Sequence, residues 1–400
     1  MLSLSLALIA SIIVIFILLR LKLHPGFAIF AGSLIVSLLV LPLDVIPSLM
    51  FSSLIDYQTV RLLIVVASTL TLSRFMEQRG LLADLATAME SLTPKLAVHF
   101  ISAAIGFVPM PGGALVSATA SSNLFKKLGL KPEQSTFINY WFRHVWEFSI
   151  PVYPAIVSAS IILNIPLSSL ISTMFPMTLL AIAFGAVFSY MMLRKAPQTK
   201  VVPSKSMIPV FLKASWPIIL IILLILVGVD AIVAFPVTLI LLLIQGRPRW
   251  VALRTTLKFG LDFKVLFMLY AVMLYKATIE STNAVNAVLL DMQAIGLPML
   301  VIIAAVPFLI GLITGISVAF VAITFPLLAP AIVSDLGVNN FAFILAYVSG
   351  MIGMFLSPLH LCLTLSVDYF KASLLKVYGY ILCPSVLIEF IALVMYLITT

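Results

Sequence analysis

Arg143, His144 and Glu147 bring ionisable side chains together in an otherwise apolar stretch. Arg143 and Glu147 are four residues apart, so on a helix their charges share one face and can neutralise each other. In an apolar environment such groups are costly and normally face a cavity or a partner. The pattern predicts that Arg143 binds an anionic substrate and that His144 or Glu147 takes up and releases a coupling ion, in the first place a proton, since histidine titrates near neutral pH. The alternative is a purely structural ion pair.

Glycine-rich stretches interrupt two further apolar runs, at 107–119 and at 311–320. Such an interruption predicts a re-entrant hairpin, whose second helix begins at depth and directs its free backbone N–H groups and positive dipole end into a cavity. These helix ends favour an anion or carboxylate, whereas the opposing carbonyls could hold Na⁺. The alternative is that the small residues only permit close helix packing. The predicted substrate-binding residues of the two tips are Pro111, Gly112, Gly113, Ser117, Thr119, Thr314, Gly315 and Ser317.

Prolines break two more long apolar segments. Pro151 and Pro154 lie within 132–163, and Pro358 lies within 339–367. A proline inside a helix removes a hydrogen bond and clashes with the preceding turn, so each segment is predicted to form two half-helices. A histidine beside such a break is as compatible with a satisfied core residue as with a ligand. Three residues of these segments complete the predicted substrate-binding set: Asn139, Ser357 and His360.

The composition shows which elements must position these residues. Apolar residues make up 63% of the chain and charged residues only 9%, against about 25% charged in soluble domains. The mean hydropathy is +1.24. The net charge of +9 comes from basic residues scattered singly between apolar segments, which excludes a nucleic-acid surface as a partner. Cys362 and Cys383 form no metal or disulfide motif and are interpreted as small buried hydrophobes. The chain is therefore an all-α polytopic membrane protein.

The apolar spans predict about ten transmembrane helices and two re-entrant hairpins in a 5+5 inverted-topology repeat. The spacing supports the repeat, because 35 residues separate Glu77 from Gly112 and also Glu280 from Gly315. The segments 44–59 and 246–262 are interpreted as polar or interfacial, and 81–92 and 283–295 as surface helices. The predicted boundaries are a first repeat 1–194 (scaffold helices 2–75, hairpin 96–125, broken helix 132–163), a cytoplasmic linker 195–207, and a second repeat 208–400 (scaffold helices 208–279, hairpin 297–333, broken helix 339–367).

The positions of lysine and arginine predict the orientation, because cytoplasmic loops are enriched in both. Assigning Arg20 and Lys22 to the inside places most other basic residues inside as well. Both termini are then extracytoplasmic, in the plasma membrane. The two hairpins enter from opposite sides, which is the plan of many secondary transporters.

Several strings of residues resemble one family of prokaryotic integral membrane proteins, DUF401. They are Pro-Met-Pro-Gly-Gly-Ala-Leu at 109–115, Asn-Tyr-Trp-Phe-Arg-His-Val-Trp-Glu at 139–147, Thr-Gly at 314–315 with Phe-Pro at 325–326, and Leu-Ser-Pro-Leu-His-Leu-Cys-Leu at 356–363. The resemblance spans nearly the whole chain and implies a distant branch of the ion transporter superfamily of gluconate, citrate and dicarboxylate carriers. It implies an elevator mechanism and a homodimeric scaffold. The Ser-Asn-Thr sodium motif of the dicarboxylate carriers is absent from both tips.

The sequence thus predicts a secondary active transporter, not an enzyme, that moves a small organic anion through membrane lipid with H⁺ or Na⁺ as coupling ion. It requires no other cofactor. One alternative is a Na⁺/H⁺ antiporter. A remote alternative is an intramembrane enzyme acting on lipid, for which Ser357 and His360 are the one weak nucleophile and base pair. No metal motif, nucleophile elbow or phosphate loop is present in the sequence.

Overall fold

The computed structural model describes residues 4–21, 23–92, 97–106, 113–194, 205–282, 298–334 and 337–399. The first half is helical throughout, with the elements α1 (Leu4–Arg20), α2 (Pro25–Val40), α3 (Val45–Ile55), α4 (Tyr57–Gln78), α5 (Leu81–Leu92), α6 (Ala97–Gly106), α7 (Gly113–Lys127), α8 (Pro132–His144), the 3₁₀ turn η1 (Val145–Phe148), α9 (Pro154–Leu163) and α10 (Leu167–Leu193). The predicted linker 195–207 lies largely outside the described residues.

Where the structure describes the second half, its regular elements are helices apart from one short β-hairpin. Its elements are η2 (Lys205–Met207), α11 (Ile208–Leu226), α12 (Ala231–Gly246), α13 (Trp250–Gly260), α14 (Phe263–Ser281), α16 (Met299–Thr314), α17 (Ser317–Ile332), β1 (Val333–Ser334), β2 (Gly337–Val338), α18 (Asn340–Phe355), α19 (Leu361–Phe370) and α20 (Leu374–Thr399). Strands β1 and β2 pair antiparallel. The predicted surface helix 283–295 lies outside the described residues.

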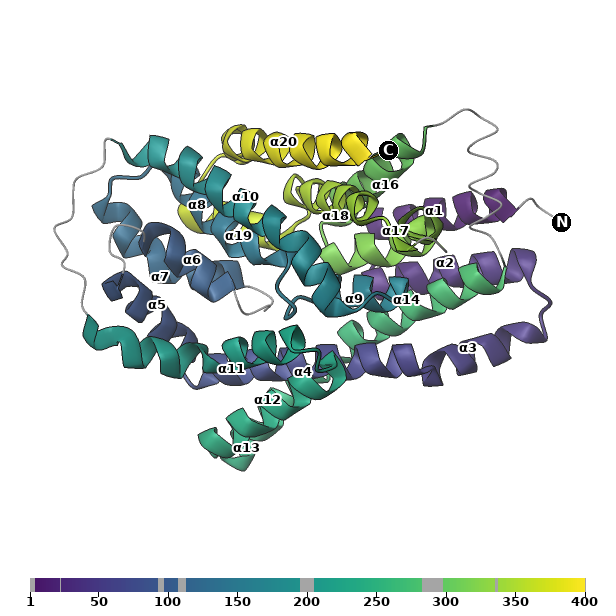
Figure 1. The fold of residues 1–400 in the computed structure, drawn as a ribbon, viewed down its shortest axis with the longest axis horizontal. Coiled ribbons are helices and arrows are strands. Elements are labelled where there is room, and N and C mark those ends of the chain that lie inside the picture. Colours follow the sequence, from purple (N-terminus) through teal and green to yellow (C-terminus); the bar gives the residue numbers. More distant parts are fainter. Residues whose placement is uncertain are drawn as a thin grey trace.

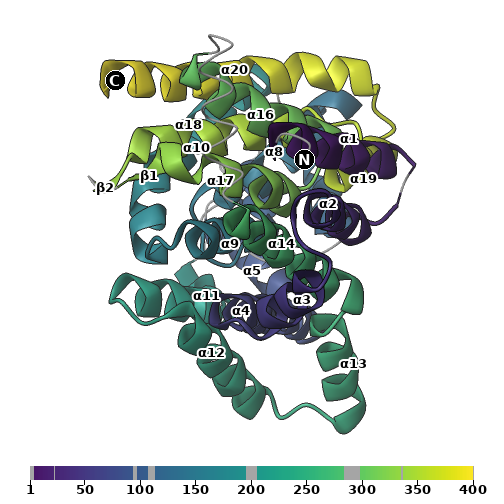
Figure 2. The ribbon, with the colours of Figure 1, turned by 90° about the vertical axis from the view of Figure 1, so that its right-hand side faces the viewer.

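The interrupted helices lie between two outer groups of helices (Figures 1 and 2). In both views α3, α4, α11, α12 and α13 lie on one side of the molecule, and α20 lies along the opposite side. The interrupted elements α8, α9 and α16 to α19 lie between them. Among the described helices, α4, α10, α11 and α20 are long and apolar enough to cross a membrane. The protein is a multi-pass membrane protein.

Acidic caps explain where several helices begin. Asp56 accepts hydrogen bonds from the backbone N–H groups of Gln58 and Thr59 at the start of α4, and Asp230 and Asp262 cap α12 and α14 in the same way. Each carboxylate satisfies N–H groups that a helix leaves without an internal partner. The polar stretch 44–59 is therefore mostly helix, with its aspartates at the helix junctions.

Two stretches differ from the sequence interpretation. The segment 246–262, read as a polar loop, contains α13, which packs on α4 where Gly260 faces Ala67 and Thr71. The helix over 81–92 forms as predicted, but α5 packs against α6 and α11 and buries Leu82 and Leu85. Helix α5 turns its apolar face to neighbouring helices. Helix α13 instead buries Thr256 and Gly260 against α4 and leaves Trp250, Val251 and Leu257 exposed. The spacing of apolar residues along a helix does not show whether they pack on another helix or face lipid.

Helices α16 and α18 approach each other through glycines, which gives a first testable prediction. A side chain at Gly353 would overlap the carbonyl oxygen of Phe308 on α16. We expect Gly353→Ala to lower the free energy of unfolding by about 1–3 kcal/mol, the usual cost of overpacking. The control is Gly379→Ala on α20, where a Cβ meets no atom within 4 Å and helix propensity should add about 0.5–1 kcal/mol. Thermal unfolding in detergent measures both; equal melting temperatures for the two variants would contradict the packing account.

Candidate functional site

Four interrupted elements converge in the middle of the fold. The chain between α8 and α9 breaks after the 3₁₀ turn η1, and the chain between α18 and α19 breaks at Ser357 and Pro358. Helix α16 ends at Thr314 and α17 begins at Ser317, with Gly315 in a left-handed conformation between them. Helices α6 and α7 flank the tip of the first predicted hairpin, but residues 107–112, which include Pro111 and Gly112, lie outside the described residues.

Two histidines join these breaks. Nε2 of His144, the last residue of α8, lies 3.1 Å from Nε2 of His360, which caps α19. Nδ1 of His144 lies 2.6 Å from the carbonyl oxygen of Tyr140, and Nδ1 of His360 lies 2.6 Å from that of Gly315. The side chains are 1% and 8% exposed. The pair therefore links the first broken segment, the second broken segment and the second hairpin.

Further ionisable side chains surround the histidine pair. Glu147 Oε1 lies 3.8 Å from His144 Nε2. Cys362 lies two residues beyond His360 and contacts both imidazoles as well as the guanidinium of Arg143. Arg143 is only 4% exposed. The interior of this membrane protein thus contains a cluster of both charge signs, and we call His144, Glu147, His360, Cys362 and Arg143 the central cluster.

Asn139 fastens the first hairpin to both broken segments. Its Nδ2 donates to the carbonyl oxygen of Ala114 at 3.1 Å and to Ser366 Oγ at 2.9 Å, and its Oδ1 accepts from Ser102 Oγ at 3.2 Å. Asn139 is fully buried. These bonds connect α6, α7, α8 and α19, one helical turn from Arg143. Its amide is therefore fully engaged in holding the elements together.

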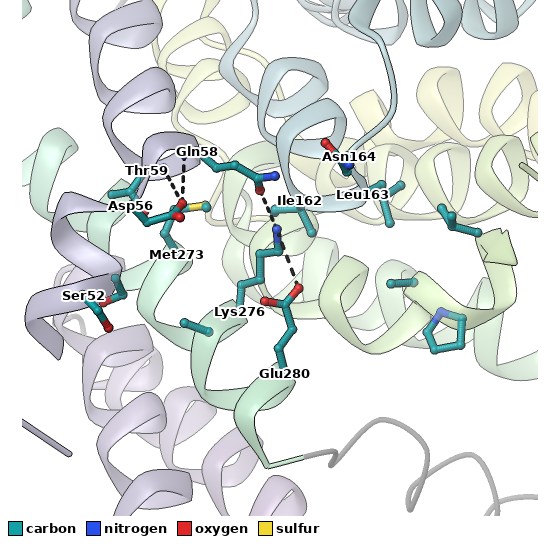
Figure 3. A pocket seen from close by; sticks show the side chains of 15 residues that line it. Ser52, Asp56, Gln58, Thr59, Ile162, Leu163, Asn164, Met273, Lys276 and Glu280 are labelled. Carbon is teal, nitrogen blue, oxygen red and sulfur yellow. Dashed lines mark hydrogen bonds and ion pairs between the residues drawn. The ribbon is translucent and has the colours of Figure 1, made fainter. Parts of the chain in front are cut away.

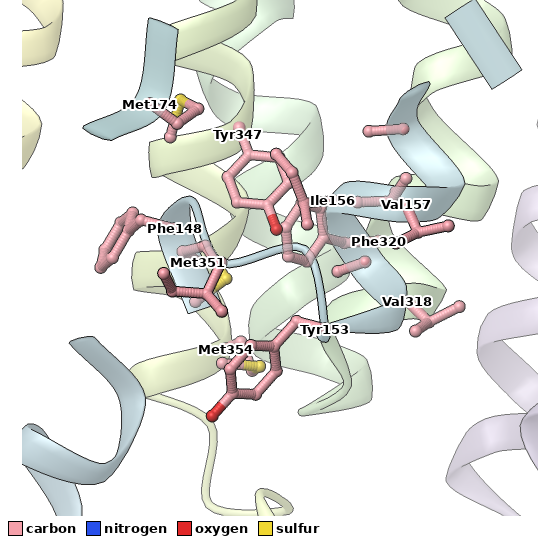
Figure 4. Close-up of a cluster of buried hydrophobic side chains, with 14 of the residues drawn as sticks. Phe148, Tyr153, Ile156, Val157, Met174, Val318, Phe320, Tyr347, Met351 and Met354 are labelled. Atoms are coloured by element: carbon pink, nitrogen blue, oxygen red, sulfur yellow. The ribbon is translucent and has the colours of Figure 1, made fainter. Parts of the chain in front are cut away.

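Tyrosine hydroxyls tie the loop after η1 to its surroundings (Figure 4). Tyr347 donates to the carbonyl oxygen of Glu147 at 2.9 Å, and Tyr153 donates to the carbonyl oxygen of Gly106 on α6. Apolar side chains pack on both sides of this loop, among them Phe148 and Phe320, which are both fully buried. Packing and carbonyl-directed hydrogen bonds therefore compensate for the helical bonds lost at the break.

The remaining predicted residues divide between the cluster and its surroundings. Ser357 is buried beside Gly315 and accepts a hydrogen bond from the N–H of Leu359. Thr314 bonds the backbone of its own turn, and Ser317 starts α17, half-buried. Gly113 and Ser117 are buried on α7, where the Ser117 hydroxyl bonds Ala114. Thr119 is exposed and bonds Leu115, so the structure places it away from the central cluster.

The sequence interpretation missed two residues. Cys362 was set aside as a buried hydrophobe, although its spacing from His360 was the available signal. Glu389 in the middle of α20 was not considered; its Oε1 accepts from Ser349 Oγ of α18 at 2.5 Å. A lone carboxyl within an apolar helix is itself a signal of a buried polar partner.

Gly315 provides a second prediction, because both its backbone conformation and the closeness of its neighbours require a glycine at this position. Its φ is +64°, and a Cβ there would lie 2.8 Å from the backbone nitrogen of His360 and 2.9 Å from Ser357 Oγ. Gly129 has nearly the same φ, +65°, with no atom within 4 Å. We expect Gly129→Ala to cost about 1–2 kcal/mol from the left-handed backbone. Gly315→Ala should cost clearly more, because the second hairpin must move away from α19. Equal shifts in thermal unfolding would show that the close approach does not matter.

A pocket of about 720 Å³ opens beside this assembly (Figure 3). It is lined by the ends of α3, α9, α14 and α17 and the start of α4. Lys276 of α14 points into it, with Nζ 2.7 Å from Gln58 Oε1 and 3.7 Å from Glu280 Oε1. Helix α9 runs from the break at Tyr153 to the pocket at Leu163, a rise of about 15 Å at 1.5 Å per residue.

The fold and its buried, interrupted helices define a class of multi-pass helical membrane proteins with broken helices around a central polar cluster. The chain belongs to the family described as "Protein of unknown function (DUF401)", whose model matches residues 2–399. Among solved structures it is similar to the YdaH transporter of Alcanivorax borkumensis, with a TM-score of 0.62, 11% sequence identity and coverage of 88% of each chain. No curated protein matches the sequence. At this identity the likeness concerns the fold.

Proposed function

We propose that this protein is a secondary active transporter that moves a small organic anion of the carboxylate type, coupled to H⁺ or Na⁺, by an elevator mechanism. The observation that carries the proposal is the buried Arg143, placed where the broken helices meet. A guanidinium matches a carboxylate with two parallel hydrogen bonds. A permanently charged residue inside a membrane protein normally belongs to a substrate or ion pathway.

Helix ends add to the preference for an anion. Helix α9 begins after Tyr153, α19 after His360, and α17 after Ile316. His360 of the central cluster directly precedes α19, and its Nδ1 lies 2.6 Å from the carbonyl oxygen of Gly315, just before α17. The Tyr153 hydroxyl, from the residue before α9, lies 3.5 Å from the carbonyl oxygen of Arg143. N–H groups of a first helical turn and the positive dipole end both attract negative charge. Broken helices in transporters present their N-terminal ends to anionic substrate groups in this way.

The hydrogen bonds support a moving body made of the interrupted elements. Asn139 to Ser366, Tyr140 to the carbonyl oxygen of Phe355, and Tyr347 to that of Glu147 all join the first broken segment to the second. The pocket of Figure 3 lies between these elements and α3, α4 and α14. A volume of about 720 Å³ is within the usual range for small-molecule sites. In the elevator proposal this pocket is the entry path, and the interrupted elements slide against the remaining helices.

The fold likeness to the YdaH transporter supports the same reading. The inverted repeat, the extracytoplasmic termini and a homodimeric scaffold belong to this proposal. The lipid-enzyme alternative gains no support, because His360 directs Nδ1 to Gly315 and Nε2 to His144. Neither ring nitrogen of His360 is therefore directed at the Ser357 hydroxyl.

Uptake into proteoliposomes tests the proposal and separates the coupling ions. Purified protein is reconstituted, and a panel of labelled carboxylates is offered under an inward Na⁺ gradient, an inward H⁺ gradient, or neither. We expect one gradient to drive accumulation of at least one carboxylate above its outside concentration. Gradient-driven Na⁺ and H⁺ exchange with no carboxylate uptake would instead establish the antiporter and overturn the anion proposal.

A further inference from the structure

The hydrogen bonds of His144 and His360 fix the tautomer of both rings. A carbonyl oxygen accepts only, so Nδ1 of each histidine must carry the proton that it donates to Tyr140 or Gly315. In the neutral imidazole the other nitrogen is then an acceptor. Two Nε2 lone pairs therefore face each other across 3.1 Å in a buried site. This arrangement is repulsive until a cation lies between or beside the two nitrogens.

Cys362 supplies a third donor atom at the same point. The ligand atoms of His144, His360 and Cys362 all lie within 4.8 Å of one another. A thiol carries a single proton, so it can satisfy only one of the two Nε2 atoms. The carboxylate of Glu147 lies outside this group of three, 3.8 Å from His144 Nε2, and would become a fourth ligand by moving toward the sulfur and His360. Two imidazoles, one sulfur and one carboxylate form a donor set for a thiophilic metal ion.

We propose that His144, His360 and Cys362, with Glu147 as fourth ligand, bind a thiophilic d¹⁰ metal ion, Cu⁺ or Zn²⁺. The spacing of the nitrogens fits this assignment. Two metal–nitrogen bonds of about 2.0–2.1 Å at a tetrahedral angle separate their nitrogens by roughly 3.3–3.4 Å, close to the 3.1 Å between the two Nε2 atoms. The three ligand atoms, which lie within 4.8 Å of one another, would draw together to bring the sulfur to bonding distance.

The surroundings of the two histidines match those of metal ligands. A ligating histidine usually donates its other ring N–H to a carbonyl or carboxylate, which fixes the ring orientation. Here both Nδ1–H groups have backbone carbonyls as partners. Because the carbonyl of Gly315 belongs to the second hairpin, metal binding would clamp that hairpin to both broken segments.

Charge balance favours a monovalent ion. Arg143 lies beside Cys362 and adds one positive charge to the site. With the Cys362 thiolate and the Glu147 carboxylate, Cu⁺ gives a neutral cluster, whereas Zn²⁺ leaves one positive charge. Buried charge without compensation is costly. We therefore expect Cu⁺ to bind more tightly than Zn²⁺.

Cobalt(II) is the direct probe, because a thiolate bound to Co²⁺ gives a charge-transfer absorption in the near ultraviolet. Purified full-length protein in detergent should develop this band with one equivalent of Co²⁺, and Zn²⁺ or Cu⁺ should abolish it. The band should be lost in Cys362→Ser and retained in Cys383→Ser, which removes the exposed cysteine of α20. His24→Gln, at the start of α2, is the matched histidine control. No band in the wild type, or a band that follows Cys383, overturns the proposal.

A second measurement keeps the site as it is, in case Cys362→Ser does not fold. In the Cys383→Ser variant the one thiol left is that of Cys362, and its alkylation by a maleimide is followed by mass spectrometry. Bound Cu⁺ or Zn²⁺ should slow alkylation by roughly the ratio of free metal to its dissociation constant, more for Cu⁺. If neither ion changes the rate, the two histidines share a proton and the metal proposal is wrong.

This inference does not rest on anion transport. Metal binding is measured without a membrane or a gradient, so a bound metal with no carboxylate uptake would leave the site standing and remove the proposed function. Carboxylate uptake without metal binding would support the proposed function and overturn the metal site.

Discussion

Replacing Arg143 with glutamine is expected to lower carboxylate uptake by roughly 10- to 100-fold, because a charged hydrogen bond contributes about 1.5–3 kcal/mol to substrate binding. Glutamine retains much of the volume and removes the charge. Lysine at this position keeps the charge but loses the two-pronged geometry, so Arg143→Lys should retain part of the uptake. Initial rates in proteoliposomes at several carboxylate concentrations give the comparison.

The matched control is Arg61→Gln. Arg61 pairs with Asp230 at 3.0 Å near the start of α4, where the two side chains are 17% and 40% exposed. Such partly exposed pairs contribute about 0–1 kcal/mol, so uptake should stay close to that of the wild type. Size-exclusion profiles and melting temperatures show whether each variant is folded. Wild-type uptake by a folded Arg143→Gln protein would remove Arg143 from the substrate site.

Replacing Asn139 with alanine should produce the largest loss of stability among the predicted site residues. The change leaves the carbonyl of Ala114 and the hydroxyls of Ser102 and Ser366 without this partner. The carbonyl of Ala114 keeps the Ser117 hydroxyl as a partner, so its lost bond costs about 1 kcal/mol, whereas each of the two hydroxyls left unsatisfied costs about 1–3 kcal/mol. We therefore expect the free energy of unfolding to fall by about 3 kcal/mol or more. Thermal unfolding in detergent measures the change.

Thr136→Ala is the control for this prediction. Thr136 is a fully buried residue of the same helix, α8, and its hydroxyl bonds the carbonyl of Pro132 within that helix. Losing one local bond should cost about 1 kcal/mol. Similar melting temperatures for Asn139→Ala and Thr136→Ala would mean that Asn139 does not hold the helices together.

Helix breaks could be predicted from the sequence because their causes are local. Gly315 adopts a left-handed conformation that few other residues tolerate, and Pro154 and Pro358 cannot continue a helix from the preceding residues. The structure breaks the chain at these places, between α8 and α9, α16 and α17, and α18 and α19. The all-helical class could also be predicted, because composition and the length of apolar spans are read directly from the sequence.

The partners across the breaks could not be predicted, because they depend on how distant helices are rotated against each other. His144 and His360 are 216 residues apart in the chain, and nothing in the local sequence indicates that their Nε2 atoms meet. Asn139 was predicted to bind substrate, and the sequence did not indicate that it also joins α6, α7 and α19 through three hydrogen bonds. Cys362 acquires its significance only from the histidine pair. Helix α13 lies in a stretch read as a loop, and it contacts α4 through Thr256 and Gly260, which no apolar periodicity indicates.

Counterflow tests the central claim most directly, since it needs no knowledge of the coupling ion. Proteoliposomes loaded with one unlabelled carboxylate are diluted into a trace of the same labelled compound, across a panel of small carboxylates. The account predicts a transient accumulation of label for at least one compound in the wild type, which Arg143→Gln should lose. No counterflow with any member of the panel, from protein that is folded and correctly inserted, would contradict the account.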